Sequence, residues 1–307
     1  MAKTTKPFTK HDRRFMVMAL GLARRGLGNA WPNPAVGCVL VRPDLEGCRD
    51  GGGRVVGRGW TQPGGRPHAE TEALARAGEL ARGATAYVTL EPCCHTGQTG
   101  PCTEALIAAG IRRVVIAVTD PDDRVAGQGV AALENAGITV DQGLDEPHAR
   151  EINAGYFTRA AKGRPLVLLK AASSLDGRIA AAGGDSKWVT SDAARARGHL
   201  MRAQADAIMV GIGTVQADDP ELTCRLPGMD RQSPARVVLD THLKTPPKGK
   251  LVASAKDVPL WVVTVPDSSP EAAETLEKTG AQVVRVAAGS DGRPDPAAVL
   301  ATLARAG

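Results

Sequence analysis

Hydrophobic and polar residues follow two periods along the first half of the chain. Phe15, Met18, Ala19 and Leu22 recur at helical spacing and predict a helix over residues 12–25. A glycine run at 51–53 marks a turn, so we expect the strands on either side to form a hairpin. The further predicted helices are 69–81, 103–109 and 127–136, and the predicted strands are 36–41, 55–59, 86–90 and 114–118. This order predicts a layered α/β domain with a mixed sheet.

A polar stretch with glycine and proline, AAKGRP at residues 160–165, separates this pattern from a second one. We therefore predict two domains, residues 1–160 and 165–307. In the second, strands are expected at 166–170, 207–210, 236–240, 260–265 and 282–286, and helices at 193–204, 271–279 and 296–306. In a parallel layout a helix usually leads into another strand. Because the sequence ends on a helix, we expect an incomplete second domain, or else a terminal helix packed on a finished sheet.

Composition narrows the class of protein. The 307 residues are 43% hydrophobic, as in an ordinary globular protein, and carry a net charge of +5. The basic residues are scattered, which indicates a solvated surface, although a positive balance also suits a phosphorylated substrate. The sequence contains no apolar run of membrane-spanning length and no signal peptide, so we expect a cytoplasmic protein. In that compartment the six cysteines are expected to be metal ligands, catalytic groups or core residues rather than disulfides.

Three short motifs carry candidate chemistry: Pro-His-Ala-Glu ending at Glu70, and two Pro-Cys pairs ending at Cys93 and Cys102. One imidazole, from His68, and two thiolates form a ligand set typical of catalytic zinc, which keeps a fourth position for water. His68 and Cys102 each open a predicted helix, where free N–H groups favour thiolates. Glu70 lies in the first turn and is expected to move protons between water and the leaving ammonia.

The spacing departs from the common zinc deaminase signature, in which two residues separate the cysteines. Here eight residues, CHTGQTGP, lie between Cys93 and Cys102, so the loop must fold back. A structural site with Cys94 or His95 as fourth ligand is one alternative, and a metal-free core role for the cysteines is another. Of the remaining cysteines, Cys38 lies in a strand and is expected in the core, while those at 48 and 224 receive no role.

At these residues the sequence resembles the bifunctional deaminase/reductase family of riboflavin biosynthesis. The long loop LEPCCHTGQTGPC carries the resemblance, together with PNPAVGCVLV, VTDPDDRVAGQG, KAASSLDGRIA, SKWVTS and ADDPELTCR. These motifs extend over nearly the whole chain. The family's second domain continues with a strand and a Glu-Gly-Gly motif that this sequence does not reach, so we expect a shortened reductase domain.

The resemblance implies a cytidine-deaminase-like mixed-sheet domain followed by a dihydrofolate-reductase-like domain. It implies zinc-dependent deamination of 2,5-diamino-6-(5-phosphoribosylamino)pyrimidin-4-one, followed by NADPH reduction of the ribose to a ribityl chain. His68, Cys93 and Cys102 match the family's zinc ligands, Glu70 its proton donor, and Asn33 its substrate-binding loop. The expected partners are this small phosphorylated pyrimidine and further copies of the chain in a homo-oligomer, with no nucleic acid and no membrane.

In the second domain the roles are likewise implied by the resemblance. The nucleotide would contact Ser173, Trp188, Thr214 and Asp218, and the substrate would contact Ser186, Arg202, Leu222 and Arg225, with Lys170 and Asp176 as possible helpers. Without the resemblance, the residues of the second domain leave its function undecided. Gly211 and Gly213 follow a strand but lack the third glycine of a dinucleotide fingerprint. The two arginines could clamp a phosphate or lie at the surface.

Two other functions fit parts of the sequence. A nucleic-acid base deaminase would need a basic channel and aromatic platforms, and three Phe and two Tyr offer few of the latter. A non-catalytic binding module stabilised by zinc would unfold on chelation, whereas a catalytic site would mostly lose activity.

Overall fold

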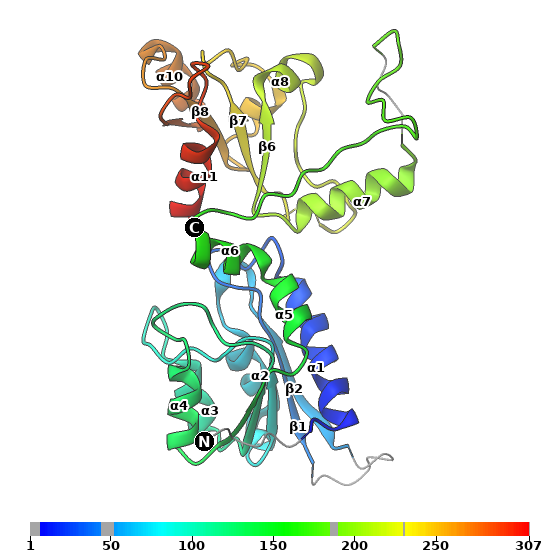
Figure 1. Ribbon diagram of the computed structural model, residues 1–307, viewed down its shortest axis with the longest axis vertical. Coiled ribbons are helices and arrows are strands. Elements are labelled where there is room, and N and C mark those ends of the chain that lie inside the picture. Colours follow the sequence, from blue (N-terminus) through cyan, green and yellow to red (C-terminus); the bar gives the residue numbers. More distant parts are fainter. Residues whose placement is uncertain (1–6, 44–51, 185–189, 230, 307) are drawn as a thin grey trace. The chain divides into compact units, whose positions relative to one another are not determined.

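The computed structural model describes residues 7–43, 52–184, 190–229 and 231–306. The chain divides into two compact units, Met1–Gly163 and Arg164–Gly307, and each has its own sheet (Figure 1). The two-part α/β fold expected from the hydrophobic pattern is confirmed. In the described residues no helix is long and apolar enough to cross a membrane.

The first unit contains a five-stranded mixed sheet in the order β2-β1-β3-β4-β5. Strands β1 (Gly37–Arg42) and β2 (Arg54–Trp60) pair antiparallel, which confirms the hairpin, although the turn predicted at 51–53 lies partly outside the described residues. Strand β3 (Thr85–Val88) is antiparallel to β1, and β4 (Arg113–Ile116) and β5 (Thr139–Gln142) continue the sheet in parallel. The sequence patterns missed β5, because its four residues are only partly buried.

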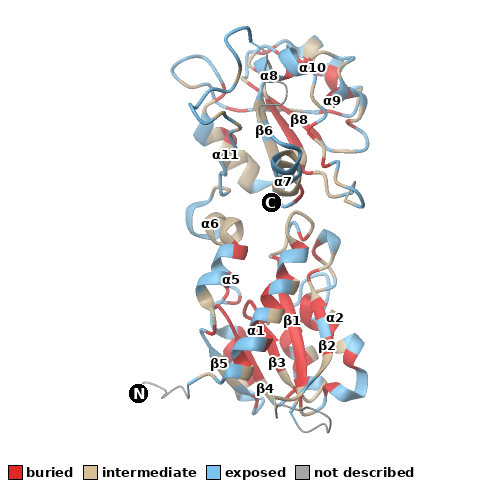
Figure 2. Ribbon diagram, turned by 90° about the vertical axis from the view of Figure 1, so that its right-hand side faces the viewer, coloured by how far each residue is buried: buried red, intermediate tan, exposed pale blue. Residues whose placement is uncertain are grey.

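Helices cover both faces of this sheet. A Cβ at Gly37 would overlap the carbonyl oxygen of Ala19 in α1 (Lys10–Ala23), and a Cβ at Gly59 would overlap that of Ala69 in α2 (Ala69–Ala77). Gly59 is the partner of Cys38 and not of Gly37, so the two glycines face opposite sides and the two helices form opposite layers. Strands β1 and β3 between them are almost entirely buried (Figure 2).

The remaining helices of this unit are short. They are α3 (Cys102–Ala108), α4 (Gln128–Asn135), α5 (Glu146–Ile152) and α6 (Ala154–Lys162). The helix predicted over 69–81 ends at Ala77, and a 3-10 turn, Gly78–Ala81, follows it because Gly78 has a positive φ of 53°.

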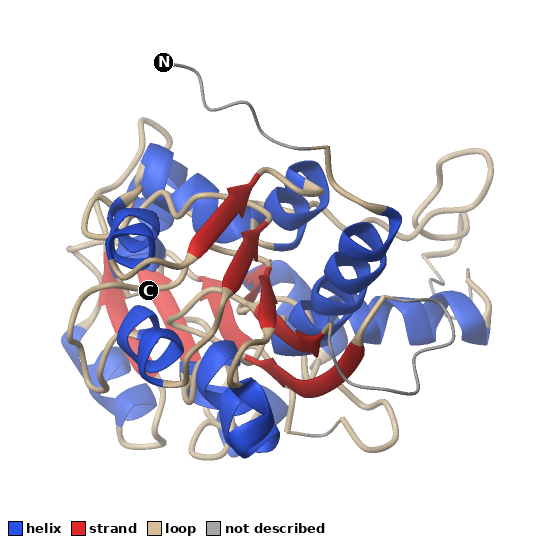
Figure 3. Ribbon diagram, turned by 90° about the horizontal axis from the view of Figure 1, so that it is seen from below, coloured by secondary structure: helices blue, strands red, loops and turns tan. Residues whose placement is uncertain are grey.

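The second unit has a parallel sheet in the order β6-β7-β8-β9. Figure 3 shows the strands of the chain in red among the helices in blue. Alternate residues of β7 and β8 enter two apolar clusters, one on each face, with Val238 and Val262 on one side and Val237 and Val263 on the other. The strands are β6 (Ala207–Gly211), β7 (Ala235–Leu239), β8 (Leu260–Thr264) and β9 (Gln282–Arg285). The helices are α7 (Asp192–Ala203), α8 (Ile212–Asp218), α9 (Lys250–Ala253), α10 (Pro270–Glu277) and α11 (Pro296–Arg305).

The strand predicted at residues 166–170 is wrong. The structure assigns no strand to this segment, and Leu169 within it is 89% exposed. An apolar run becomes a strand only when a neighbour completes its backbone hydrogen bonds. Among the described residues the strand pairs of β6 are all with β7, so this run has no partner.

Candidate zinc and active site

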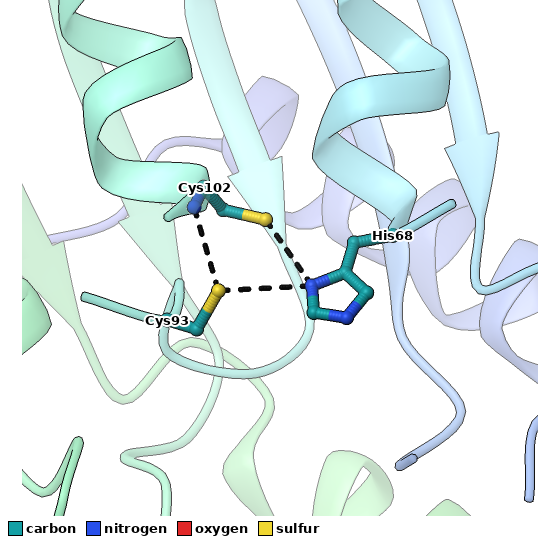
Figure 4. Close-up of side chains that lie close together, drawn as sticks. All are labelled: His68, Cys93 and Cys102. Atoms are coloured by element: carbon teal, nitrogen blue, oxygen red, sulfur yellow. Dashed lines mark hydrogen bonds between the residues drawn. The ribbon is translucent and has the colours of Figure 1, made fainter. Parts of the chain in front are cut away.

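Three side chains from three segments converge in the first unit. His68 is the N-cap of α2, Cys102 is the first residue of α3, and Cys93 lies in the segment that joins β3 to α3. The Nδ1 atom of His68 lies 3.3 Å from the sulfur of Cys102 and 3.7 Å from that of Cys93. All three donor atoms face one another (Figure 4).

These distances fit a zinc ion. Zn–N bonds near 2.0 Å and Zn–S bonds near 2.3 Å at a tetrahedral angle separate the two donors by about 3.5 Å, and the two observed values bracket this. In the described part of the chain, neither Cys94 nor His95 belongs to this group of donors. The thiol of Cys94 donates instead to the carbonyl oxygen of Arg124, at 3.4 Å. A set of three ligands leaves a tetrahedral position open, as in a catalytic site.

Hydrogen bonds with neighbouring groups shift the pKa values of the two thiols. The backbone N–H of Cys102 donates to the sulfur of Cys93 at 3.4 Å, and the backbone N–H of Thr103 donates to the Cys93 carbonyl at 3.1 Å. The Cys102 thiol hydrogen bond and those from His68 and the Cys102 backbone outweigh burial and lower the pKa of Cys93 to about 4. The same thiol hydrogen bond, with burial, raises the pKa of Cys102. A metal ion that takes the place of these protons binds both thiolates.

Glu70 is the second residue of α2 and is only 3% exposed. Burial and, after it, the charge of Cys93 raise the pKa of its carboxyl group from 4.5 to about 7, against a lowering by His68. A carboxyl group in such an environment exchanges protons near neutral pH.

A cavity of about 300 Å³ opens at these residues. His68, Glu70, Cys93 and Asn33 all line it. The Asn33 amide donates to the carbonyl oxygen of Gly65 at 2.8 Å and lies 3.4 Å from Nε2 of His68. The structure therefore brings together all five residues that the sequence suggested for the deaminase half, with Cys102 completing the metal group.

Sequence reasoning missed several residues of this cavity. Asp120 and Tyr156 line it, and the Tyr156 hydroxyl donates to the Asp120 carboxylate at 2.8 Å. Asn153 pairs its amide with both backbone groups of Ala35, each at 2.9 Å, and so fixes the loop that holds Asn33. Asp120 falls in the segment VTDPDDRVAGQG, but Asn153 carries no local signal, because its partner is 118 residues away.

The second-unit candidates are spread over several segments. The side chains of Ser173, Thr214 and Asp218 are exposed, and the last two belong to α8. Lys170 and Asp176 are also exposed. Ser186 and Trp188 lie outside the described residues.

Arg202, Leu222 and Arg225 come from α7 and the segment before β7. Arg202 donates to the carbonyl oxygen of Thr223 at 2.6 Å, and Leu222 is buried with φ of 57°. Arg225 pairs with Glu221 at 3.1 Å, and its backbone N–H donates to His199. These contacts bring the two arginines to one segment of the unit.

Two known protein regions match the chain. Residues 9–118 match the cytidine and deoxycytidylate deaminase zinc-binding region, and residues 165–307 match the RibD C-terminal domain. The fold and the site thus define a zinc-dependent deaminase joined to a reductase domain of the dihydrofolate-reductase type.

Relatives that align with most of the chain identify the family within this class of protein. Riboflavin biosynthesis protein RibD of Aquifex aeolicus is 45% identical over 273 residues, which cover 89% of this chain and 73% of the relative. RibD of Escherichia coli is 44% identical over 276 residues, or 86% and 72%. The solved structure of Acinetobacter baumannii RibD is similar with a TM-score of 0.81 at 40% identity, covering 97% of this chain and 78% of that one. The chain belongs to the RibD family: it is a riboflavin-biosynthesis enzyme with a zinc-dependent deaminase half and an NADPH-dependent reductase half.

Proposed function

We propose that the first unit deaminates the diaminopyrimidinone phosphoriboside named above, and that the second unit reduces the ribose of the product. A RibD relative of Thermotoga maritima, 36% identical with a TM-score of 0.80 over 96% of this chain and 78% of that one, is described as a diaminohydroxyphosphoribosylaminopyrimidine deaminase and 5-amino-6-(5-phosphoribosylamino)uracil reductase. The observation that carries the proposal is the buried Glu70 carboxyl beside three donors at zinc-ligand spacing.

The reaction replaces a ring amine by a carbonyl oxygen, so water is consumed and ammonia leaves. His68, Cys93 and Cys102 would hold the zinc ion, which would lower the pKa of a water molecule. Glu70 is placed to take up a proton and to deliver it to the departing amine, because it is buried beside these ligands and its pKa of about 7 lets it exchange protons near neutral pH. Asn33 orients the ring, since its amide is fixed by Gly65 at the cavity wall.

The charges around the cavity support a phosphorylated substrate. Arg66, Arg124 and Arg159 line it together with the acidic and metal-binding residues. Arg124 is paired with Asp122 at 2.6 Å, and Arg66 donates to Thr99 at 2.5 Å. Guanidinium groups bind phosphate with charge-assisted hydrogen bonds, so a pyrimidine with a ribose phosphate suits this cavity better than a neutral base.

The decisive test is the variant Glu70→Gln, which keeps the side chain's size and removes its proton exchange. We expect deamination to fall by about 10²- to 10⁴-fold, the usual contribution of a general acid–base group. Zinc content should stay that of the wild type. Reduction of the already deaminated substrate with NADPH, measured in the same sample, should be unchanged.

Glu72→Gln is the matched control. Glu72 lies in the same turn of α2 and pairs with Arg76 at 2.9 Å, away from the donors. Its variant should deaminate at the wild-type rate. Full deamination by Glu70→Gln would refute the role of Glu70, and a wild-type protein that turns over nucleosides or tRNA but not the phosphoriboside would refute the substrate.

In the second unit, the nucleotide is assigned to Ser173, Trp188, Thr214 and Asp218, and the substrate to Ser186, Arg202, Leu222 and Arg225. Lys170 and Asp176 are possible helpers. The proximity of Arg202 and Arg225 supports a phosphate on the substrate.

Two further expectations concern the protein as a whole. We expect the protein in the cytoplasm, a reducing compartment in which cysteines serve as metal ligands and core residues. A homo-oligomer is expected from the sequence, and light scattering on the purified protein measures it.

A further inference from the structure

A buried carboxylate joins the metal-binding segment to another segment that lines the cavity. Glu91 is 3% exposed and lies two residues before Cys93. Its Oε2 accepts the backbone N–H groups of Asp120 and Gly127, at 3.3 and 3.0 Å. Its Oε1 accepts the backbone N–H of Val130 at 3.1 Å. One side chain therefore satisfies three backbone donors of a distant segment.

Helix α4 depends on this side chain for its cap. The N-cap of α4 is Gly127, whose φ of 80° permits the turn but which has no side chain to accept a hydrogen bond. Val130 is the third residue of the helix, at the position that an N-cap side chain normally satisfies. The Glu91 carboxylate, from another segment, accepts this N–H in place of an N-cap side chain. Its negative charge interacts favourably with the positive end of the helix dipole.

Gly129 allows the first turn of α4 to pack closely against Glu91 and Pro92. A Cβ at Gly129 would overlap the carbonyl oxygen of Pro92 and would lie 3.0 Å from Oε1 of Glu91. Only a glycine lets the first turn of α4 approach the 91–92 segment this closely.

The segment that Glu91 fixes is a wall of the substrate cavity. Asp120, Asp122, Arg124 and Val125 line the cavity, and all lie between the hydrogen bonds at Asp120 and at Gly127. We propose that Glu91 is a positioning residue for the deamination, which holds this wall at a fixed position relative to the zinc ligands so that its side chains contribute to binding of the pyrimidine. The inference rests on the proposed function of the first unit.

The test is the variant Glu91→Gln in the full chain. A glutamine keeps the size, but its NH₂ group must face a backbone N–H on one of the two sides, so one anchor of the wall is lost. We expect KM for deamination to rise by about tenfold or more, with kcat within about threefold, because the wall contributes to binding in both ground and transition states. Zinc content should equal that of the wild type, and hydrogen exchange should quicken in peptides covering 119–130.

Glu79→Gln is the control for the charge change, because Glu79 is exposed in the 3-10 turn after α2. Its KM should match the wild type. Gly129→Ala disturbs the same contact while it keeps the Glu91 carboxylate and its charge, and it replaces Glu91→Gln if that variant does not fold. A lower melting temperature with unchanged KM in the folded variants would show a purely structural role and overturn the inference. If the wild type and Glu79→Gln both fail to deaminate the phosphoriboside, the proposed function fails instead.

Discussion

The ion-pair network at Asp12 gives a stability prediction whose size follows from the structure. Asp12 is 3% exposed, and its carboxylate accepts hydrogen bonds from Arg113 at 2.6 Å, the Tyr87 hydroxyl at 2.8 Å and the backbone N–H of Thr9 at 2.9 Å. Burial alone would raise the pKa of Asp12, but these hydrogen bonds outweigh it and lower the pKa from 3.8 to about 2. Such a shift corresponds to about 2.5 kcal/mol of unfolding free energy at neutral pH.

The sign of the pH dependence follows from the lowered pKa. The folded state favours the ionised carboxylate, so the stabilisation is fully present above the unfolded pKa of 3.8 and is lost as the pH falls toward 2. About half should be gone at pH 3. We therefore expect Asp12→Asn to lower the unfolding free energy of the first unit by about 2.5 kcal/mol at pH 7, and the difference from the wild type to shrink below pH 4.

Urea titrations at pH 3, 5 and 7, followed by hydrogen exchange of peptides from β3 and β4, measure the first unit separately from the second. Asp141→Asn is the matched control, because Asp141 contacts the same Arg113 at 2.7 Å but its side chain is 22% exposed against 4% for Asp12. It should lose less than half as much. A loss at pH 3 as large as that at pH 7 would refute the electrostatic account and leave only the capping geometry at Thr9.

Two other predictions concern the metal and the packing of α1. Chelation should abolish deamination while leaving NADPH-dependent reduction and the far-UV spectrum in place, and Cys93→Ser should lose zinc whereas Cys94→Ser keeps it. An unfolded first unit after chelation would instead indicate a structural zinc. Gly37→Ala should destabilise the first unit by about 3 kcal/mol or more, because its Cβ overlaps the Ala19 carbonyl. Gly21 lies within α1 with nothing near the position of its Cβ, so Gly21→Ala should stabilise the first unit by about 0.5–1 kcal/mol in urea unfolding. Equal effects at both glycines would contradict the packing argument.

The local sequence predicted the structure best where candidate metal ligands lie next to a predicted helix start. The prolines before His68 and Cys102, and the apolar periodicity after them, placed both ligands at helix starts, as the structure has them. The eight residues between Cys93 and Cys102 excluded a single helical turn as the carrier of both thiols. Fold class, the hairpin and the candidate ligands were therefore within reach of the sequence, because local periodicities and short motifs mark each of them.

Tertiary structure decided what depends on distant partners. The run at 166–170 has the composition of a strand but no neighbour in the described residues to complete its hydrogen bonds. Glu91 and Asn153 look like ordinary polar residues until the fold brings their backbone partners to them, 39 and 118 residues away at the farthest. The sequence pattern indicates which side chains prefer burial. A buried polar group, however, is stable only when the folded chain supplies its hydrogen-bond partners.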